Sequence, residues 1–208
     1  PPIPSYEAFG DPQSFIVADA KADKSVPDGN FATYGFIPVS VSSPDEQRGY
    51  WLINISNVTG TITQANFVCK VDRQGSKSST IEAYWSNGTF TESGITWNNQ
   101  PCGTTENSTE LPCNQTVVDF DHVLNERIGN LTFDISKPVK IVHEQLFYDK
   151  HFILLIRHRE ESKIDQDTLF FSKEDPDPED KCGLYLAVEG IIPPQIKFSI
   201  NNTSPRIN

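Results

Sequence analysis

Acidic side chains crowd one short stretch of this sequence, and such a cluster could bind a hard cation. Residues 174–180 read Glu-Asp-Pro-Asp-Pro-Glu-Asp, so the backbone that carries the carboxylates is stiffened by two prolines. Calcium takes six to eight oxygen ligands, which such a loop could supply in part. The stretch therefore predicts a calcium site at Asp175, Asp177, Glu179 and Asp180. The alternative is a solvated acidic loop that protects a sheet edge.

Aromatic residues around an Asn-Gly pair form a second candidate site. Tyr84, Trp85 and Phe90 flank Asn87-Gly88, a pair that favours a tight turn because both residues tolerate positive φ. Exposed aromatic faces beside polar groups are typical of ligand sites, and sugar rings can stack on them. Neighbouring strand residues point to opposite faces, so Tyr84 and Trp85 cannot share one platform. Trp85 and Phe90 are therefore candidate sugar-binding residues; the alternative, which we favour, is that they pack in the core.

Residue patterns that carry catalysis are missing from the sequence. The histidines are scattered and show no metalloprotease spacing, and neither a Gly-x-Ser-x-Gly motif nor a glycine-rich phosphate loop occurs. The paired carboxylates fall in polar stretches, where burial would not raise a pKa for acid catalysis. We predict a non-catalytic protein that requires no cofactor, with calcium as the one ion to consider.

The charge balance limits the kinds of partner that the protein is expected to bind. The chain has 28 acidic and 17 basic residues, a net charge of -11. Phosphate binding needs clustered Lys and Arg, so we expect no nucleic-acid partner. The longest strongly apolar run, residues 152–156, is far shorter than the roughly 20 residues of a spanning helix, so we expect no membrane span.

Glycosylation motifs are far more frequent than chance allows. Eight of the 14 asparagines begin an Asn-X-Ser/Thr motif, whereas 33 Ser and Thr residues would give about two by chance. Asparagine, Ser and Thr also populate turns, which is the alternative explanation. The excess predicts N-glycosylation at Asn54, Asn57, Asn87, Asn107, Asn114, Asn130, Asn201 and Asn202.

The four cysteines indicate an oxidising compartment. Cys102 and Cys113 enclose a short polar loop, and a bridge there would contribute roughly 2–3 kcal/mol on a chain-entropy argument. Cys69 and Cys182 each lie in or beside a strand-like run. We predict the bridges Cys102–Cys113 and Cys69–Cys182, although four cysteines allow three pairings. A zinc site is the rival, but no C-x-x-C motif occurs. The protein is expected to be extracellular, secreted or at the cell surface.

Short runs of alternating β-branched and aromatic residues, separated by Gly, Pro, Asn and Asp, predict an all-β fold. Helical or irregular structure is expected only at residues 122–127 and 139–145. We predict one antiparallel β-sandwich of jelly-roll type over residues 14–189, with a proline-rich extension at 1–13 and another extension at 190–208. The expected strands are 14–20, 36–41, 50–55, 65–71, 79–85, 117–120, 131–135, 152–157, 168–172 and 184–188.

The second extension contains a strand-like segment. Residues 195–200 alternate, which places Ile196, Phe198 and Ile200 on one face after a Pro-Pro spacer. This segment could be an edge strand of its own sheet, or it could complete the sheet of a second copy. In the second case the three apolar residues would be the donated side chains.

Several segments, in the same order along the chain, resemble the DNRLRE domain family. Residues 91–101, Thr-Glu-Ser-Gly-Ile-Thr-Trp-Asn-Asn-Gln-Pro, carry the most specific similarity, and the resemblance spans residues 14–189. The other segments are 18–20, 27–30, 34–35, Arg48 with 52–56, 62–67, 133–136, 152–156, 169–174 and 184–188.

This resemblance implies an extracellular β-sandwich module of a group that includes alginate-binding modules. Trp97 within the 91–101 motif is expected to be a buried packing anchor rather than a sugar platform. The chain has Phe90 where the family usually has Trp, and Cys182-Gly183 where it has Pro. These departures leave the ligand open.

Two functional interpretations follow. The first, which we favour from the sequence, is a structural or adhesive surface glycoprotein that self-assembles as a homo-oligomer or filament through its terminal strand. The second is a stand-alone carbohydrate-binding module that recognises an extracellular polysaccharide. A polyanionic ligand fits the second interpretation only if calcium bridges it to the acidic protein, because like charges repel.

Overall fold

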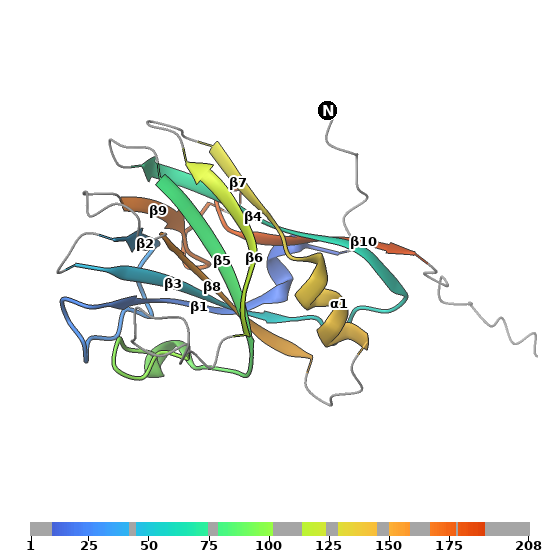
Figure 1. The fold of residues 1–208 in the computed structure, drawn as a ribbon, viewed down its shortest axis with the longest axis horizontal. Coiled ribbons are helices and arrows are strands. Elements are labelled where there is room, and N and C mark those ends of the chain that lie inside the picture. Colours follow the sequence, from blue (N-terminus) through green and yellow to red (C-terminus); the bar gives the residue numbers. More distant parts are fainter. Residues whose placement is uncertain are drawn as a thin grey trace, which may run out of the picture.

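In the part of the chain that the computed structural model describes, ten strands form one antiparallel sheet that curls into two packed layers (Figure 1). The structure describes residues 10–41, 45–74, 79–101, 114–123, 129–144, 150–158, 167–177 and 179–189. The strands are β1 (Ile16–Asp23), β2 (Phe36–Ser40), β3 (Gln47–Asn54), β4 (Thr61–Gln74), β5 (Ser79–Asn87), β6 (Asn114–Val123), β7 (Gly129–Asp134), β8 (His151–His158), β9 (Asp167–Phe171) and β10 (Gly183–Glu189). The helical elements are η1 (Pro12–Phe15), η2 (Glu92–Gly94) and α1 (Ser136–Glu144).

Strand pairing defines the two layers. One layer has the order β1-β3-β8-β5-β6. In the other, β4 pairs with β7 on one side and with β10 and β9 on the other, and β9 pairs with β2. The layers are joined where β2 meets β3 at the pair Ser40 and Gln47. All of these pairs are antiparallel, so the predicted all-β antiparallel sandwich is confirmed.

The main core lies between the two layers and is dominated by aromatic residues. Trp51 packs edge-on against Phe67 and Phe170, with ring centroids 5.5 and 5.8 Å away. These rings, together with Phe133 and Phe152, are fully buried because alternate residues of each strand face inward. Burying one such side chain stabilises the fold by roughly 1.5–3 kcal/mol.

A second, smaller core covers the outer face of β1, β3, β8 and β5. Here Tyr50 and Leu52 of β3 lie beside the small alanines of β1 and contact residues of the segment that follows β5. That segment, residues 88–101, contributes Ile95 and Trp97, and both side chains are buried. The predicted role of Trp97 as a packing anchor is therefore confirmed. These buried side chains therefore hold residues 88–101 against the outer face of the sheet.

Most element predictions agree with the structure. Each predicted strand overlaps one observed strand, and the helix expected at 139–145 is α1. The helix expected at 122–127 was wrong at its start, because residues 122 and 123 belong to β6 and pair with Thr80 and Ser79. Residues 124–128 lie outside the described residues, as do residues 1–9 and the whole of the extension at 190–208.

Candidate functional site

Trp85 does not form the predicted sugar platform. Its side chain is 5% exposed and belongs to the main core, because β5 turns Ile81, Ala83 and Trp85 to the same inner face. Phe90 is partly buried and packs edge-on against Tyr50, with ring centroids 6.4 Å apart. The hypothesis of a Trp85 platform is thus wrong, and the favoured alternative, packing, accounts for both residues.

The acidic loop uses its carboxylates to shape its own turns. Oδ1 of Asp175 accepts the backbone N–H of Asp177, and Oδ1 of Asp177 accepts that of Glu179. The carboxylate of Asp180 pairs with the ammonium of Lys70. The structure does not bring Asp175, Asp177, Glu179 and Asp180 together as a metal-binding group in the part of the chain that it describes. This geometry does not support the calcium site predicted at these four residues.

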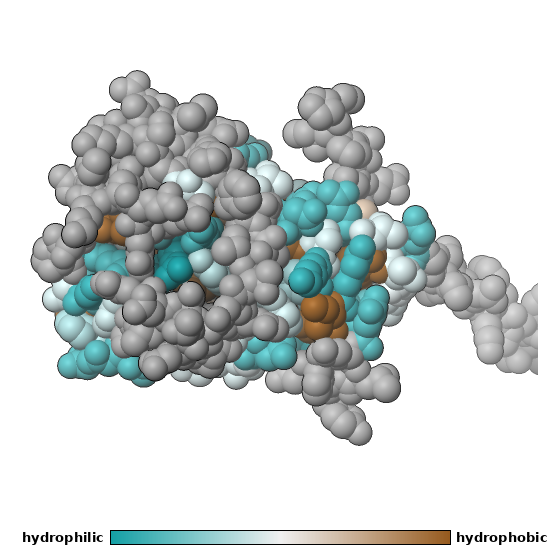
Figure 2. Space-filling model, viewed as in Figure 1, coloured by the Kyte–Doolittle hydropathy of each residue, from teal (hydrophilic) through white to brown (hydrophobic). Residues whose placement is uncertain are grey.

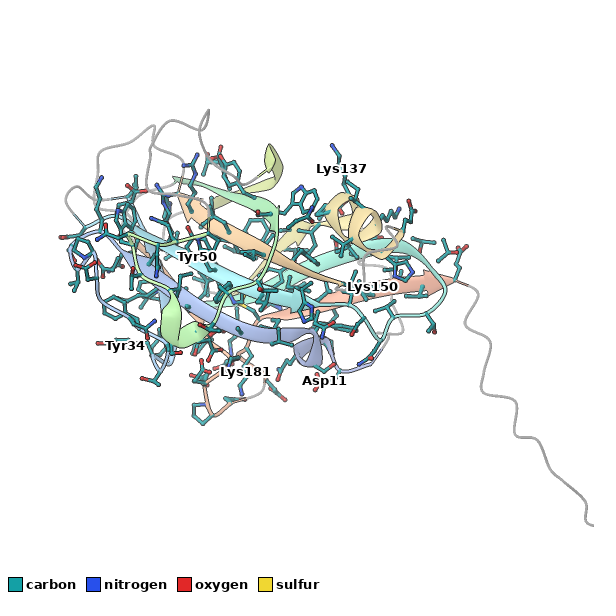
Figure 3. The ribbon with its side chains drawn as sticks, turned by 90° about the horizontal axis from the view of Figure 1, so that it is seen from below. Asp11, Tyr34, Tyr50, Lys137, Lys150 and Lys181 are labelled. Carbon is teal, nitrogen blue, oxygen red and sulfur yellow. A yellow bond between two sulfur atoms is a disulfide. The ribbon has the colours of Figure 1, made fainter. Side chains whose placement is uncertain are left out.

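An exposed tyrosine and a partly buried phenylalanine instead lie in the connection between β1 and β2. The side chain of Tyr34 is 56% exposed, the largest value among the exposed large hydrophobic residues that the structure describes. The ring of Phe31 lies 5.7 Å away at 80° to it, an edge-to-face arrangement that is favourable for two rings. Figure 3 shows Tyr34 at one end of the molecule, on its surface. This pair, Phe31 and Tyr34, is called the aromatic pair below.

A buried lysine lies beside the aromatic pair. Nζ of Lys21 is 4.0 Å from the ring centroid of Phe31 and 5.2 Å from that of Tyr34. The same ammonium lies 3.2 Å from Oδ2 of Asp23. Burial alone would raise the pKa of Asp23, but hydrogen bonds from Ser25, Gln47 and Lys21 outweigh it and lower that pKa. Asp23 is therefore ionised at neutral pH and holds Lys21 beside the two rings.

Side-chain amides fix the backbone that carries the aromatic pair. Nδ2 of Asn30 donates to the backbone oxygens of Glu92 and Ile95, at 2.5 and 2.8 Å. Nδ2 of Asn98 donates to Oδ1 of Asp28 at 2.8 Å. Each of these bonds joins the β1–β2 connection to residues 91–98, which are themselves packed on the sheet. The position of the aromatic pair thus depends on a second segment that is distant in the sequence.

An acidic cluster, Asp19, Glu92 and Glu174 with Lys173, lies at the base of this region. Nζ of Lys173 is 2.7 Å from Oε1 of Glu92 and 2.6 Å from Oε1 of Glu174. The backbone N–H of Lys173 donates to Oδ2 of Asp19, and that of Asp19 donates to Oε1 of Glu92. The three carboxylates are close enough to hold a metal ion, but the Lys173 ammonium already pairs with two of them. The cluster thus functions as an ion-pair network that joins three segments.

Burial dominates the electrostatics of this acidic cluster. The side chain of Asp19 is 2% exposed. Desolvation, together with the nearby carboxylates of Glu174 and Glu92, raises the pKa of Asp19 to about 8, although the hydrogen bond from the Lys173 backbone opposes the shift. Asp19 is therefore mostly protonated at neutral pH. A neutral Asp19 reduces the repulsion among the three carboxyl groups.

Arg48 fastens the segment that supports the aromatic pair. Its guanidinium lies 4.7 Å from the ring centroid of Trp97 and 2.7 Å from Oε1 of Glu46. Gln100 donates to the backbone oxygen of Trp97 and accepts the hydroxyl of Tyr50 at 2.5 Å. Burial raises the pKa of Tyr50 to about 12, so this hydroxyl remains a neutral donor. Residues 97–100 are thereby bound to β3.

The coloured surface in Figure 2 is mainly hydrophilic. Hydrophobic residues appear on this face only as small patches separated by hydrophilic ones. Among the helices in the described ranges, none combines the length and the apolar character needed to cross a membrane.

The remaining predicted sites fall into three groups. Cys69 and Cys182 form a disulfide, which is the predicted pairing. Asn57, Asn87 and Asn130 are exposed, and Asn54 is partly buried. The other predicted residues lie outside the described ranges or, for Asn114, in a strand whose side chains are not described; they are Cys102, Cys113, Asn107, Asn114, Asn201, Asn202, Ile196, Phe198 and Ile200.

Sequence reasoning did not single out the aromatic pair or the acidic cluster. The segments that carry the family resemblance include Tyr34, Asp19, Glu92 and Lys173. The resemblance indicates the fold of these segments but not the role of these side chains. A signal was nonetheless present, because Tyr34 stands in an irregular stretch between two strands, where an aromatic residue has no core position to fill.

Comparison with known families agrees with this architecture. No curated protein matches the chain. A family model, carbohydrate-binding module family 96, matches residues 13–181, which include the aromatic pair, the acidic cluster and nine of the ten strands. The match supports the carbohydrate-binding module, the second of the two interpretations, over the structural protein that the sequence favoured, while the DNRLRE name stays a prediction. Because the match covers most of its length, the chain belongs to carbohydrate-binding module family 96.

Proposed function

We propose that this protein is a non-catalytic, extracellular module that binds a polysaccharide at the surface around Tyr34. The observation that carries the proposal is the exposed ring of Tyr34, packed against the partly buried Phe31 on a connection that Asn30 holds in place. An aromatic face beside hydrogen-bonding groups matches the two surfaces of a sugar ring. The disulfide supports an extracellular location, since such bonds persist in oxidising compartments.

The charges near Tyr34 favour a neutral polysaccharide. Each nearby ammonium pairs with a carboxylate: Lys21 with Asp23 at 3.2 Å and Lys24 with Glu46 at 3.5 Å. Lys173 pairs with two glutamates in the acidic cluster. A uronate chain would therefore meet positive charges that are already compensated, on a protein of net charge -11. Hydrogen bonding and stacking, rather than charge, would provide the affinity.

The test is retention on polysaccharides before and after Tyr34→Ala. Affinity electrophoresis against xylan, β-glucan and mannan identifies the ligand, with alginate and pectate as acidic comparisons. Truncating an exposed anchor aromatic costs about 2 kcal/mol, or roughly a 30-fold loss of affinity. Tyr185→Ala is the matched control, because Tyr185 is also exposed but lies on β10. Equal retention of the two variants would remove Tyr34 from the site.

The family match favours this interpretation over a self-assembling structural protein. The segment that suggested strand donation, residues 195–200, lies outside the described residues. No described residue argues for assembly, so the proposal does not include it.

A further inference from the structure

Four glycosylation motifs have side chains that the structure describes, and their surroundings differ. They begin at Asn54, Asn57, Asn87 and Asn130. We propose that Asn57, Asn87 and Asn130 carry N-linked glycans and that Asn54 does not. This inference is independent of the proposed sugar-binding surface, because it concerns glycans attached to the protein itself.

Asn57 lies at the tip of a turn anchored from both sides. The backbone N–H of Val58 donates to the oxygen of Ile55 at 3.1 Å, and both of these side chains are buried. Asn57 and its partner hydroxyl residue Thr59 are both exposed. A glycan on Asn57 would therefore extend into solvent without displacing any core side chain.

Asn87 and Asn130 meet the same requirement on other elements. Asn87 ends β5 and is followed by Gly88 at φ +133°, where the chain leaves the sheet. Asn87, Gly88 and Thr89 are all exposed. On β7, Asn130 and Thr132 are exposed while the intervening Leu131 is buried, so both motif side chains face outward.

Asn54 differs because its side chain is partly buried and lies only three residues from Asn57. Oδ1 of Asn54 accepts the backbone N–H of Ser56 at 2.8 Å, and the side chain is partly buried at the end of β3. This bond shapes the turn that exposes Asn57. A glycan on Asn54 would crowd that turn, and it would lie three residues from the glycan on Asn57.

The modification is a group transfer that the exposed asparagines can undergo. The side-chain Nδ2 bonds to C1 of the first sugar and loses a proton, while the C1–O bond to a lipid-linked phosphate or diphosphate carrier breaks. The carrier phosphate leaves with the electron pair of that bond. The hydroxyl residue two positions on, Thr59, Thr89 or Thr132, completes each recognition motif.

Two of the three proposed sites lie far from Tyr34. Asn54 pairs with His151 and Asn87 with Phe152, so both lie where β8 begins, and Ile55 bonds to Lys150. Figure 3 shows Tyr34 and Lys150 at opposite ends of the molecule. Lys21, which contacts both rings, pairs with Gly49, and the five steps along β3 from Gly49 to Asn54 span about 17 Å. Glycans at Asn57 and Asn87 would therefore leave the aromatic pair accessible.

Peptide mapping of the full chain secreted from insect cells tests the proposal. Enzymatic deglycosylation in ¹⁸O-labelled water converts each glycosylated Asn to labelled Asp, so occupancy is read at every motif in one experiment. We expect labelled Asp at positions 57, 87 and 130 and unlabelled Asn54. Occupancy of Asn54, or absence of glycan from any of the three exposed sites, would overturn the proposal.

Motif variants separate site choice from secretion. Thr59→Ala, Thr89→Ala and Thr132→Ala each remove one motif but keep its asparagine, and each should remove one glycan step on a denaturing gel. Ser56→Ala removes the Asn54 motif while keeping the backbone N–H that Asn54 accepts, so it should change neither the glycan number nor secretion. A lost glycan step in Ser56→Ala would contradict the assignment of Asn54.

Discussion

At the scale of single residues, Arg48 shows how a buried charge serves this fold. Its side chain is fully buried, yet it meets the carboxylate of Glu46, the amide oxygen of Gln100 and the face of Trp97. Arginine suits this position because its planar guanidinium can bond along its edge and stack on its face at once. The buried guanidinium therefore orients residues 97–100 and does not interact with solvent.

Arg48→Ala should lower the free energy of unfolding by about 3–5 kcal/mol, because it leaves Glu46 buried without its main partner. Urea denaturation followed by tryptophan fluorescence measures this change. Lys24→Ala is the matched control, since Lys24 is 3.5 Å from the same Glu46 but partly exposed. The control should cost no more than about 1 kcal/mol. Similar losses in the two variants would show that burial of Arg48 is not what matters.

At the scale of elements, the acidic cluster joins parts of the chain that the sheet does not pair. Asp19 belongs to β1, Glu92 to η2, and Lys173 and Glu174 to the turn after β9. The backbone of Glu92 also accepts from Asn30, which fixes the aromatic pair. The protonation of Asp19 is thus linked to the loops on which the proposed binding surface depends.

Stability should fall as the pH rises through the titration of Asp19. Its pKa is about 8 in the folded protein and 3.8 when unperturbed, so the folded state binds the extra proton between these values. Stabilisation from that proton is complete below the lower pKa and lost above the higher one. Asp19→Asn should remove this dependence, because the amide can replace the protonated carboxyl. The melting temperature of the variant minus that of the native protein should rise from pH 5 to 8 and then level off. Each kcal/mol of lost stabilisation corresponds to a difference of about 2–4 °C.

Asp23→Asn provides a control of opposite sign. The pKa of Asp23 is lowered in the folded protein, so its stabilising effect is present above the unperturbed pKa and lost only as the pH falls. This variant should be destabilised by a constant amount between pH 5 and 9. A pH-dependent difference for Asp23→Asn, or none for Asp19→Asn, would contradict the assignment.

The sequence predicted the elements better than the site, for a physical reason. Strands bury one face, so their period-two pattern is visible in a single sequence, and all ten were located. The same pattern, Ile81, Ala83 and Trp85 on one face, should have placed Trp85 in the core. Tyr34 and Lys173 lie far apart in the sequence and in irregular segments, where no period shows which side chains meet.

At the scale of the whole molecule, a disulfide ties the last described strand to the body. Cys69 lies on β4, and Cys182 comes immediately before β10, at a sequence separation of 113 residues. The family match ends at residue 181, just short of this cysteine. Cys182 and β10 therefore complete the sandwich with residues that follow the matched region.

Replacing both cysteines, Cys69→Ser with Cys182→Ser, should cost about 2–5 kcal/mol of stability, because the unfolded chain loses a long-range constraint. Urea denaturation with and without reductant measures the loss. The comparison is made between the two reduced proteins, so that any Cys102–Cys113 bridge is open in both, and their midpoints should then agree. An unchanged midpoint in the variant would show that strand pairing alone holds β10 in place.

The way the β1–β2 connection is attached has a consequence for how ligand preference can change. Asn30 and Asn98 hold this connection largely through backbone carbonyls and one carboxylate, and neither amide reaches the main core. The residues of the β1–β2 connection that do not make these bonds can therefore be exchanged without a change in the sheet pairing or the disulfide. Variation confined to residues 31–35, which follow the Asn30 anchor and precede β2, would thus redirect the module to another glycan at little cost in folding, which makes this segment the natural place to diversify in a selection experiment.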